Sequence, residues 1–233
     1  MQLFYQPEIM TGSNFLTEEE SKHCIKVLRH TAGDTLEVVD GAGAKFKVRI
    51  TDANAKKTKF EIINHERKPD LPYYIHIGIA PTKQIERTEF FLEKAIEIGV
   101  DEISFFFGRH SERKNINMER MQKKAISAMK QSLKYQLPKI ELYQDLKSLI
   151  SHIKPEQSRY IAYVDFNNSL HLKSAASLND NSLILIGPEG DFNEEELNLA
   201  IKNDFKKVSL GLSRLRTETA GIVACHTLNL INS

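Results

Sequence analysis

Two glycine-bearing stretches near the C-terminus hold the residues best suited to chemistry, and residues 186–192 form the first. This stretch reads Ile-Gly-Pro-Glu-Gly-Asp-Phe, follows an apolar run and precedes Asn193 and three consecutive glutamates. Glycine lets a backbone approach a ligand closely, and ligands of open α/β sheets bind beyond the carboxyl ends of the strands. We therefore treat it as a candidate ligand loop, with a plain turn as the alternative.

The same stretch is not a phosphate loop. The chain contains neither Gly-x-x-x-x-Gly-Lys nor Gly-x-Gly-x-x-Gly. The glutamates at 194–196 would also occupy the positive end of the following helix dipole, which disfavours a phosphate there. These features argue against a nucleotide hydrolase.

The second stretch begins with the apolar run 208–211 and continues into a polar loop that ends where a helix is expected to begin. This loop contains Arg216, Thr217 and Glu218, so hydrogen-bond donors and acceptors gather beyond a strand. Thr217 by itself is explained as a helix N-cap. A helix cap does not require Arg216 and Glu218 as well, so their presence favours a ligand-binding or catalytic site in this loop.

Other catalytic constellations are absent from the sequence. The eight histidines show no metal-ligand spacing, no Gly-x-Ser-x-Gly elbow occurs, and Cys24 and Cys225 are far apart. Cys24 beside His23 is a weak nucleophile signal because neighbours on a helix point apart. His226 lies on the apolar face of the last helix and is expected to be a core residue. We expect neither a metal site nor a disulfide.

The elements that must position the two loops follow an α/β pattern from Tyr73 onward. Short apolar runs alternate with amphipathic helical patterns, as in a parallel sheet covered by helices on both faces. The expected strands are 75–80, 103–107, 160–165, 183–187 and 208–211, and the expected helices are 83–98, 117–134, 194–203 and 218–231.

The first 70 residues are β-rich and predict a small barrel with one helix. Strands are expected at 3–5, 35–40, 45–52 and 58–64, with a hairpin turn at Asp40-Gly41-Ala42-Gly43. The helix is expected at 18–30, where Thr17 and Glu20 have the spacing of a capping box. Residues 66–72 carry two prolines and no apolar period, so we place the domains at 1–68 and 73–233.

The charge is balanced overall and uneven along the chain. The 233 residues have 32 Lys and Arg, 31 Asp and Glu, and a formal charge of +1. Residues 109–139 contain nine cations and two anions, a local charge of +7. In the helix at 83–98, the cations Lys83, Arg87 and Lys94 also form a stripe. Local clusters set the field that a polyanion meets, although a solvated rim remains the alternative.

Composition and sequence pattern indicate the cellular compartment of the protein. The hydrophobic fraction is 41%, no run approaches the roughly 20 apolar residues of a membrane span, and the N-terminus lacks the pattern of a signal peptide. The two separated cysteines suit a reducing compartment. We expect a cytoplasmic protein without a membrane partner.

Taken together, the motifs resemble the 16S rRNA uracil-N3 methyltransferase family of the knotted SPOUT superfamily, over nearly the whole chain. The resemblance rests on the two loops above, on His-x-x-x-Val-Leu-Arg at 23–29, on the helix segment 83–100 and on Ser-Glu-Arg at 111–113. It implies a PUA-like N-terminal barrel that binds RNA and a C-terminal α/β domain with a trefoil knot.

The resemblance also implies a function and a set of site residues. The family forms homodimers, uses S-adenosyl-L-methionine (AdoMet) and methylates N3 of a uridine in the decoding region of 16S rRNA, in the small ribosomal subunit. The cofactor would be bound by Ile186, Gly187, Pro188, Glu189, Gly190, Leu210, Gly211, Leu215, Arg216 and Thr217. RNA would be bound by His23, Arg29, Lys83, Arg87, Lys94, Arg113 and Lys134.

Chemistry assigns two further roles. Uridine N3 carries a proton, so the reaction needs a base or a group that stabilises the imide anion. Arg216 is the candidate for stabilising the anion, and Glu218 for orienting Arg216 or accepting the proton. Where the family usually has an arginine, Lys134 keeps the charge but lacks the planar fork.

Two alternatives remain. A pure RNA-binding module would have lost the cofactor, which the intact glycines at 187, 190 and 211 argue against. A methyltransferase for a small metabolite would not need the local charge of +7.

Overall fold

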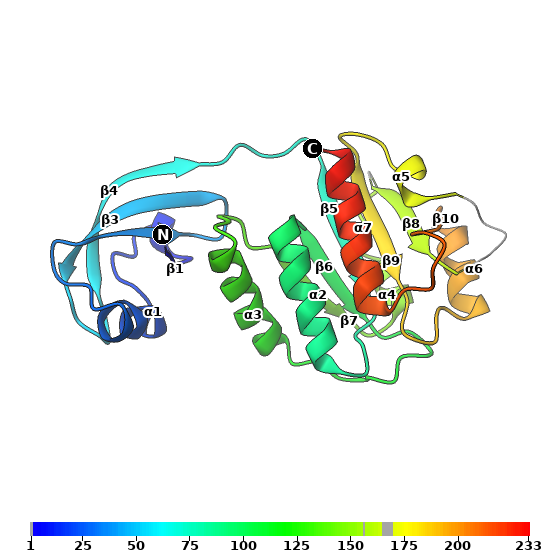
Figure 1. Cartoon of the computed structure of the whole chain (residues 1–233), viewed down its shortest axis with the longest axis horizontal. Helices are drawn as coiled ribbons and strands as arrows, with labels where there is room; N and C mark the ends of the chain where they lie inside the picture. The colour runs from blue at the N-terminus through cyan, green and yellow to red at the C-terminus, as the bar shows by residue number, and fades with distance from the viewer. Residues whose placement is uncertain (1, 156, 165–169) are drawn as a thin grey trace. The chain divides into compact units, whose positions relative to one another are not determined.

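The computed structural model (Figure 1) describes residues 2–155, 157–164 and 170–233, and its contacts divide them into two compact units. The first unit consists of residues 1–70 with 126–137, and the second of residues 71–125 with 138–233. The sequence-based limits, 1–68 and 73–233, treat each domain as continuous, whereas the first unit also takes in a later segment of the chain.

Four strands form the sheet of the first unit, in the order β1-β2-β3-β4. β1 pairs in parallel with β2, and the other neighbours are antiparallel. The expected hairpin joins β2 to β3, where the Asp40 carboxylate accepts the N–H groups of Ala42 and Ala44 at 2.7 and 2.9 Å. The strands are β1 (Leu3–Tyr5), β2 (Thr35–Val39), β3 (Ala44–Asp52) and β4 (Lys59–Arg67).

The helix of the first unit is shorter than predicted. A short 3-10 turn, η1 (Ile9–Thr11), comes first; α1 (Glu18–Lys22) then continues into a π-helical turn, η2 (His23–Val27), and Arg29 adopts a left-handed φ of 61°. That conformation cannot continue a right-handed helix, so the prediction of a helix to residue 30 was wrong. Thr17 is the N-cap and accepts from Glu20 N–H.

Glu20 has partners other than the cap. Its carboxylate accepts the N–H of Tyr5 and lies 2.5 Å from Lys130 Nζ. Lys130 belongs to the segment 126–137, so a partly buried ion pair connects this segment to α1 of the first unit. Apolar side chains from the strands and the helix fill the core beside it: Phe4, Leu16, Cys24, Val38, Phe46, Val48, Ile50 and Phe60.

The second unit is built on a six-stranded parallel sheet in the order β10-β8-β9-β5-β6-β7. This confirms the expected α/β class. Residues 183–186 of β9 are all buried, as expected for a strand covered on both faces. The strands are β5 (Tyr74–Ile79), β6 (Glu102–Phe106), β7 (Lys139–Tyr143), β8 (Ser158–Ala162), β9 (Asn181–Ile186) and β10 (Lys206–Val208).

Helices cover both faces of this sheet. α2 (Ile85–Ile98) and α7 (Thr217–Ile231) pack together on one face, in front of the sheet in Figure 1. α4 (Leu146–Ile150) and α6 (Glu194–Lys202) contact each other away from that pair, and a short α5 (Leu172–Ala175) contacts α7. α3 (Met118–Gln131) begins in the second unit and ends in the first.

Two details of α7 matter for the sequence predictions. A Cβ built on Gly221 would lie 2.6 Å from the Phe91 ring, so the absence of a side chain allows α7 to approach α2. His226 is exposed, so its prediction as a core residue was wrong. The helix has a second, exposed apolar side that includes Leu230, which is 55% exposed. His226 lies on this exposed side rather than on the face toward α2.

Candidate functional site

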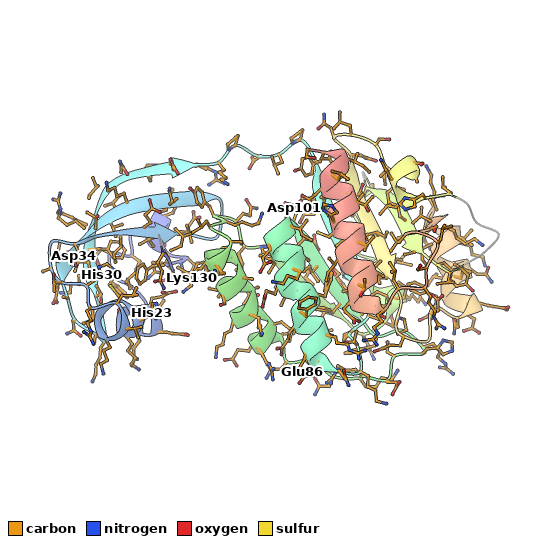
Figure 2. All side chains as sticks on the ribbon, in the orientation of Figure 1. His23, His30, Asp34, Glu86, Asp101 and Lys130 are labelled. Carbon is orange, nitrogen blue, oxygen red and sulfur yellow. The ribbon has the colours of Figure 1, made fainter. Side chains whose placement is uncertain are left out.

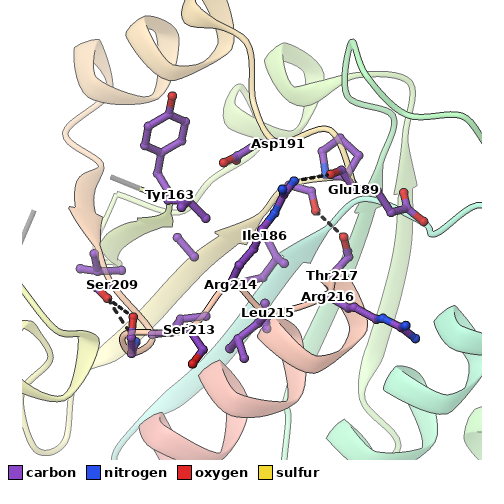
Figure 3. A pocket seen from close by; sticks show the side chains of 18 of the residues that line it. Tyr163, Ile186, Glu189, Asp191, Ser209, Ser213, Arg214, Leu215, Arg216 and Thr217 are labelled. Carbon is purple, nitrogen blue, oxygen red and sulfur yellow. Dashed lines mark hydrogen bonds between the residues drawn. The ribbon is translucent and has the colours of Figure 1, made fainter. Parts of the chain in front are cut away.

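A cavity of about 470 Å³ lies beyond the carboxyl ends of β8, β9 and β10 (Figure 3). This is within the usual size range of small-molecule pockets. Its walls come from the segments 162–164, 186–191 and 208–220, with Arg87 from α2. The two loops singled out by the sequence thus face one cavity. Of the predicted cofactor residues, Ile186, Gly187, Pro188, Glu189, Leu210, Gly211, Leu215, Arg216 and Thr217 line it.

Thr217 connects the two loops. Its hydroxyl donates to the backbone carbonyl of Gly187 at 3.1 Å, as the dashed line in Figure 3 shows. Arg216 is the N-cap residue of α7, and no side chain caps that helix. The interpretation of Thr217 as an N-cap was therefore wrong: its side chain turns away from its own helix and holds the 186–191 loop instead.

Glu189 is held from two sides. Its Oε1 accepts the backbone N–H of Lys83 at 2.8 Å, and its carbonyl accepts from the Arg214 guanidinium at 3.4 Å. Its Oε2 is buried and has no hydrogen-bond partner among the described residues. An unpaired buried carboxylate oxygen is costly, so this atom is available to a ligand group that donates a hydrogen bond.

Gly190 has a different position from its neighbours. It is not among the residues that line the cavity, and its carbonyl lies 3.1 Å from His110 Nδ1. A Cβ at Gly190 would be 2.9 Å from the Cβ of His110. The glycine here permits close packing of the loop against the segment that follows β6, rather than close approach to the cavity.

The second loop makes a tight turn at Gly211. Its φ is 136°, a value that glycine adopts easily and other residues rarely do. Ser209 fixes the turn because its hydroxyl donates to the Gly211 carbonyl at 2.9 Å and accepts the Gly211 N–H at 3.1 Å. The chain then presents Leu212 fully to solvent and turns back through Arg214 to α7.

The charges around the cavity are mixed. Arg87, Arg214 and Arg216 line it together with Glu189 and Asp191. The pKa of the Asp191 carboxyl is raised by burial, against the opposing effect of nearby hydrogen bonds and positive groups.

Glu218 does not line the cavity. It is 8% exposed, and its Oε1 lies 4.0 Å from Arg87 Nε. Its Oε2 is buried without a hydrogen-bond partner in the described part of the chain. The carboxylate therefore lies behind the wall, beside Arg87, whereas Arg216 is exposed on the wall itself.

The predicted RNA-binding residues of the second unit have acidic or carbonyl partners. Lys83 Nζ is 2.6 Å from Glu112, and Lys94 Nζ is 2.9 Å from both Glu93 and Glu97. The Arg113 guanidinium donates to the carbonyls of Thr82 and Lys83 at 3.0 and 2.6 Å. Carbonyl bonds leave the charge of Arg113 uncompensated, while Lys83 and Lys94 each form an exposed or half-exposed ion pair.

In the first unit, His23 lies on the π-helical segment (Figure 2), and Arg29 lies in the turn after it. His23 Nε2 is 2.5 Å from Gln2 Nε2, and Arg29 is exposed. Lys134 follows Leu133, whose φ is 55°, and its N–H donates to the Met129 carbonyl. These three residues belong to a different compact unit from the cavity.

Cysteine and metal chemistry find no support in the described residues. Burial raises the pKa of the Cys24 thiol to about 11, which makes it a poor nucleophile. Among the described residues, no group of His, Cys, Asp and Glu could hold a metal ion. No helix in the described ranges is long and apolar enough to cross a membrane.

The predicted site residues leave out five polar residues of the wall, which are Tyr163, Asp191, Ser209, Ser213 and Arg214. Tyr163 directly follows β8, so the rule that ligands bind beyond strand ends could have found it. Asp191 is within the first loop, where its position in the chain suggests only a turn residue. Arg214 carries no signal of its own, because only the fold turns it toward Glu189.

Comparison with known proteins identifies the family. A family model described as an RNA methyltransferase domain matches residues 69–229, and one described as an RNA methyltransferase PUA domain matches residues 16–63. The chain belongs to the RNA methyltransferase family. The cavity lies within the methyltransferase domain of that match, and α1, β2 and β3 lie within the PUA match.

Individual relatives agree with this assignment. A ribosomal RNA small subunit methyltransferase E from Buchnera aphidicola is 31% identical over 221 residues, which cover 92% of this chain and 86% of the relative. A crystal structure described as a probable rRNA-methyltransferase from Porphyromonas gingivalis is 43% identical, covers 99% of both chains and has a TM-score of 0.89.

A further solved structure is informative about ligands. A methyltransferase from Legionella pneumophila, in complex with the bound cofactor SAM, is 26% identical to this RNA methyltransferase. The match covers 100% of this chain and 98% of the other, with a TM-score of 0.86. The predicted SPOUT-type α/β fold with a PUA-like N-terminal domain is confirmed by these matches.

Proposed function

We propose that this protein transfers a methyl group from AdoMet to N3 of a uridine in 16S rRNA. The observation that carries the proposal is the cavity formed by two glycine-bearing loops beyond the strand ends, inside an RNA methyltransferase domain. Relatives named ribosomal RNA small subunit methyltransferase E support the rRNA substrate, and the SAM-bound relative supports the cofactor.

The cavity suits AdoMet rather than a nucleotide phosphate. Two of its walls are backbone loops that expose peptide groups, as an adenosine needs, and Glu189 and Asp191 offer negative charge to a cationic ligand. The three glutamates at the N-terminus of α6 and the capping box of Asn193 and Glu196 leave the start of that helix closed to a phosphate. When bound, the cofactor supplies an electrophilic methyl group on a positively charged sulfur.

The protein's own residues must then promote loss of the proton from uridine N3. Arg216 is exposed on the cavity wall, so its guanidinium is accessible to a base and can stabilise the imide anion. Glu218 lies behind the wall beside Arg87, which favours a role in orienting Arg87 over direct contact with the base. Arg87 is thus a second cation that Glu218 directs toward the substrate.

The proposal includes the protein's partners. We infer that each unit has its own phosphate contact, the exposed Arg29 in the first and the uncompensated Arg113 in the second. The second apolar side of α7, which includes Leu230, suits a homodimer. A reaction on ribosomal RNA or the small subunit would take place in the cytoplasm.

Reconstitution tests the reaction and the target atom. Small subunits from cells that lack this protein would be incubated with the purified enzyme and AdoMet, and the modified nucleoside mapped by mass spectrometry. We expect one N3-methyluridine in the decoding region. A methylated cytosine or ribose would contradict the N3 assignment, and no AdoMet binding in calorimetry would favour a pure RNA-binding module.

Single-turnover rates test the roles of the residues. Arg216→Ala is expected to slow methylation by about 100-fold, since removing one anion-stabilising donor typically costs that much. Glu218→Gln should slow it less, and Arg87→Ala with Glu218→Gln should be no slower than Arg87→Ala alone. Unchanged rates in both Arg216→Ala and Glu218→Ala would refute these assignments.

A further inference from the structure

Asp191 has an unusual backbone conformation at the cavity wall. Its φ is 61°, in the left-handed region, although it is not a glycine. Residues other than glycine are uncommon there, and aspartate and asparagine are the types that tolerate it best. Such conformations persist where the surrounding structure holds them and are concentrated at functional sites. The conformation turns the Asp191 side chain to the wall that the 186–191 loop forms.

The Asp191 carboxylate joins two strand ends. Its Oδ1 accepts the N–H of Phe192 at 2.8 Å, and it also receives a backbone hydrogen bond from Val164, which follows β8. A Cβ at Gly187 would lie 3.4 Å from the same Oδ1. The carboxylate is therefore fixed against the ends of β8 and β9, and it lines the cavity.

This negative charge has no close counter-ion. In the part of the chain that the structure describes, the Asp191 carboxylate forms no ion pair; His110 Nδ1 lies 3.2 Å from the Asp191 backbone carbonyl, and Arg214 and His110 act on the carboxylate only through their charge. Burial raises the pKa of its carboxyl, as expected for a charge that is desolvated without an ion pair. Glu189, the other acid of the wall, accepts the Lys83 N–H at Oε1 and keeps its Oε2 for a hydrogen-bond donor of the ligand.

We propose that Asp191 binds the positive charge of the cofactor's methionyl part, either the sulfonium or the ammonium group, and thereby selects this cationic ligand. The inference rests on the proposed function and adds to it a residue that determines cofactor specificity. Figure 3 shows Asp191 and Arg216 on different sides of the cavity, so Asp191 can bind the positive charge of the cofactor while Arg216 contacts the uracil ring.

The test compares three ligands on two variants. Asp191→Asn keeps the size, the hydrogen-bond acceptor and the tolerance of a left-handed φ, and it removes only the charge. Glu194→Gln is the matched control, since Glu194 is exposed at the start of α6 and its loss changes the net charge equally. Calorimetry would measure the affinities of AdoMet, S-adenosylhomocysteine and 5′-methylthioadenosine, which lacks both cationic groups and the carboxylate.

We expect Asp191→Asn to weaken AdoMet about tenfold or more, the usual effect of losing a charged hydrogen-bond partner. Binding of 5′-methylthioadenosine should stay within about twofold. If S-adenosylhomocysteine weakens equally, the group bound is the ammonium; if it does not, the group is the sulfonium. Glu194→Gln should change none of the three affinities.

Equal changes in affinity for all three ligands, or no change for any, would overturn the proposal. Asp191 would then have only a structural role, holding the ends of β8 and β9 together. Thermal unfolding of Asp191→Asn and of Asp191→Gly, which suits the same φ, detects a variant that simply fails to fold. If the wild-type protein bound no AdoMet, the proposed function would fail instead, so the two failures are distinguishable.

Discussion

At the scale of single residues, the cavity depends on side chains that hold backbone rather than on side chains that react. Thr217 fixes the Gly187 carbonyl, Ser209 fixes the Gly211 turn, and Glu189 fixes Lys83. Each of these bonds joins segments that are distant in sequence or bends one loop sharply. The shape of the cavity is therefore set by a few polar contacts, and it should respond to their removal.

Thr217→Val tests this directly. The change keeps the side-chain volume and removes the hydroxyl that donates to Gly187, leaving a partly buried carbonyl without that donor. We expect a loss of about 1 kcal/mol in the free energy of unfolding together with weaker AdoMet binding. Urea unfolding and calorimetry measure the two effects. Thr217→Ser retains the hydroxyl and should resemble the wild type; an equal loss in both variants would contradict the explanation.

At the scale of elements, part of the basic segment 109–139 serves to pack helices. Glu89 on α2 is 4% exposed, and both Arg120 and Lys124 of α3 form ion pairs with it. Lys139 pairs with the buried Glu102, and Lys130 pairs with Glu20. Several cations that look free in the sequence thus compensate buried acids, and fewer are available for RNA.

A three-residue series separates packing from RNA binding. Arg120→Ala with Lys124→Ala leaves Glu89 buried and unpaired, and should cost about 3 kcal/mol of stability. Adding Glu89→Gln removes the orphaned charge and should recover most of that loss. The stability of each variant is read from urea unfolding. No recovery in the triple variant would contradict the role of Glu89.

The same triple variant then reports on RNA. The triple variant regains most of its stability but lacks two cations. Any weakening of its RNA affinity is therefore assigned to lost phosphate interactions of Arg120 and Lys124. The salt dependence of binding should become shallower by about 0.7 to 0.9 for each phosphate interaction removed. An unchanged slope would show that Arg120 and Lys124 serve the structure alone.

At the scale of the whole molecule, stability includes a polar cluster at the start of the parallel strands. His76 on β5 is 6% exposed, its Nε2 lies 2.7 Å from Ser104 Oγ, and Glu102 is 3.7 Å away. Tyr74, Lys139 and Glu141 complete the surrounding charged and titratable groups. Burial is the main cause that lowers the pKa of His76 to about 4, although Glu102 acts in the opposite direction.

This shift predicts how stability depends on pH. The pKa of His76 is about 4 in the folded state and about 6.5 in an unfolded chain. The unfolded chain therefore takes up the proton first, and stability falls as the pH decreases from about 6.5 to 4, by at most about 1.4 kcal/mol per pH unit.

Urea unfolding between pH 7.5 and 4.5 measures the effect. His76→Gln keeps a polar partner for Ser104 and should have a shallower slope than the wild type over this range. Because other groups titrate in both proteins, only the difference between the two slopes is assigned to His76. Identical slopes would mean that His76 is not the group responsible.

Signals along the sequence predicted most of the elements and the general place of the site, but not β7, α4 or α5. Apolar runs such as 183–186 specify buried strands, the glycines at 187 and 211 mark loops, and the motifs indicate the family, because all these signals depend on neighbours along the chain. The family resemblance carried by these motifs implied ten cofactor residues in the two loops, and nine of them line the cavity.

Only the tertiary structure decided what each polar side chain does. In the fold, the Thr217 hydroxyl donates to a carbonyl 30 residues away, and Lys130 forms an ion pair with Glu20. Glu218 is buried behind the cavity wall, whereas His226 is exposed. The fold also places Asp191 on the cavity without a close counter-ion. Hydrogen bonds and ion pairs act over a few ångströms in space, so the partner of a polar group is set by which strands and helices the fold brings together.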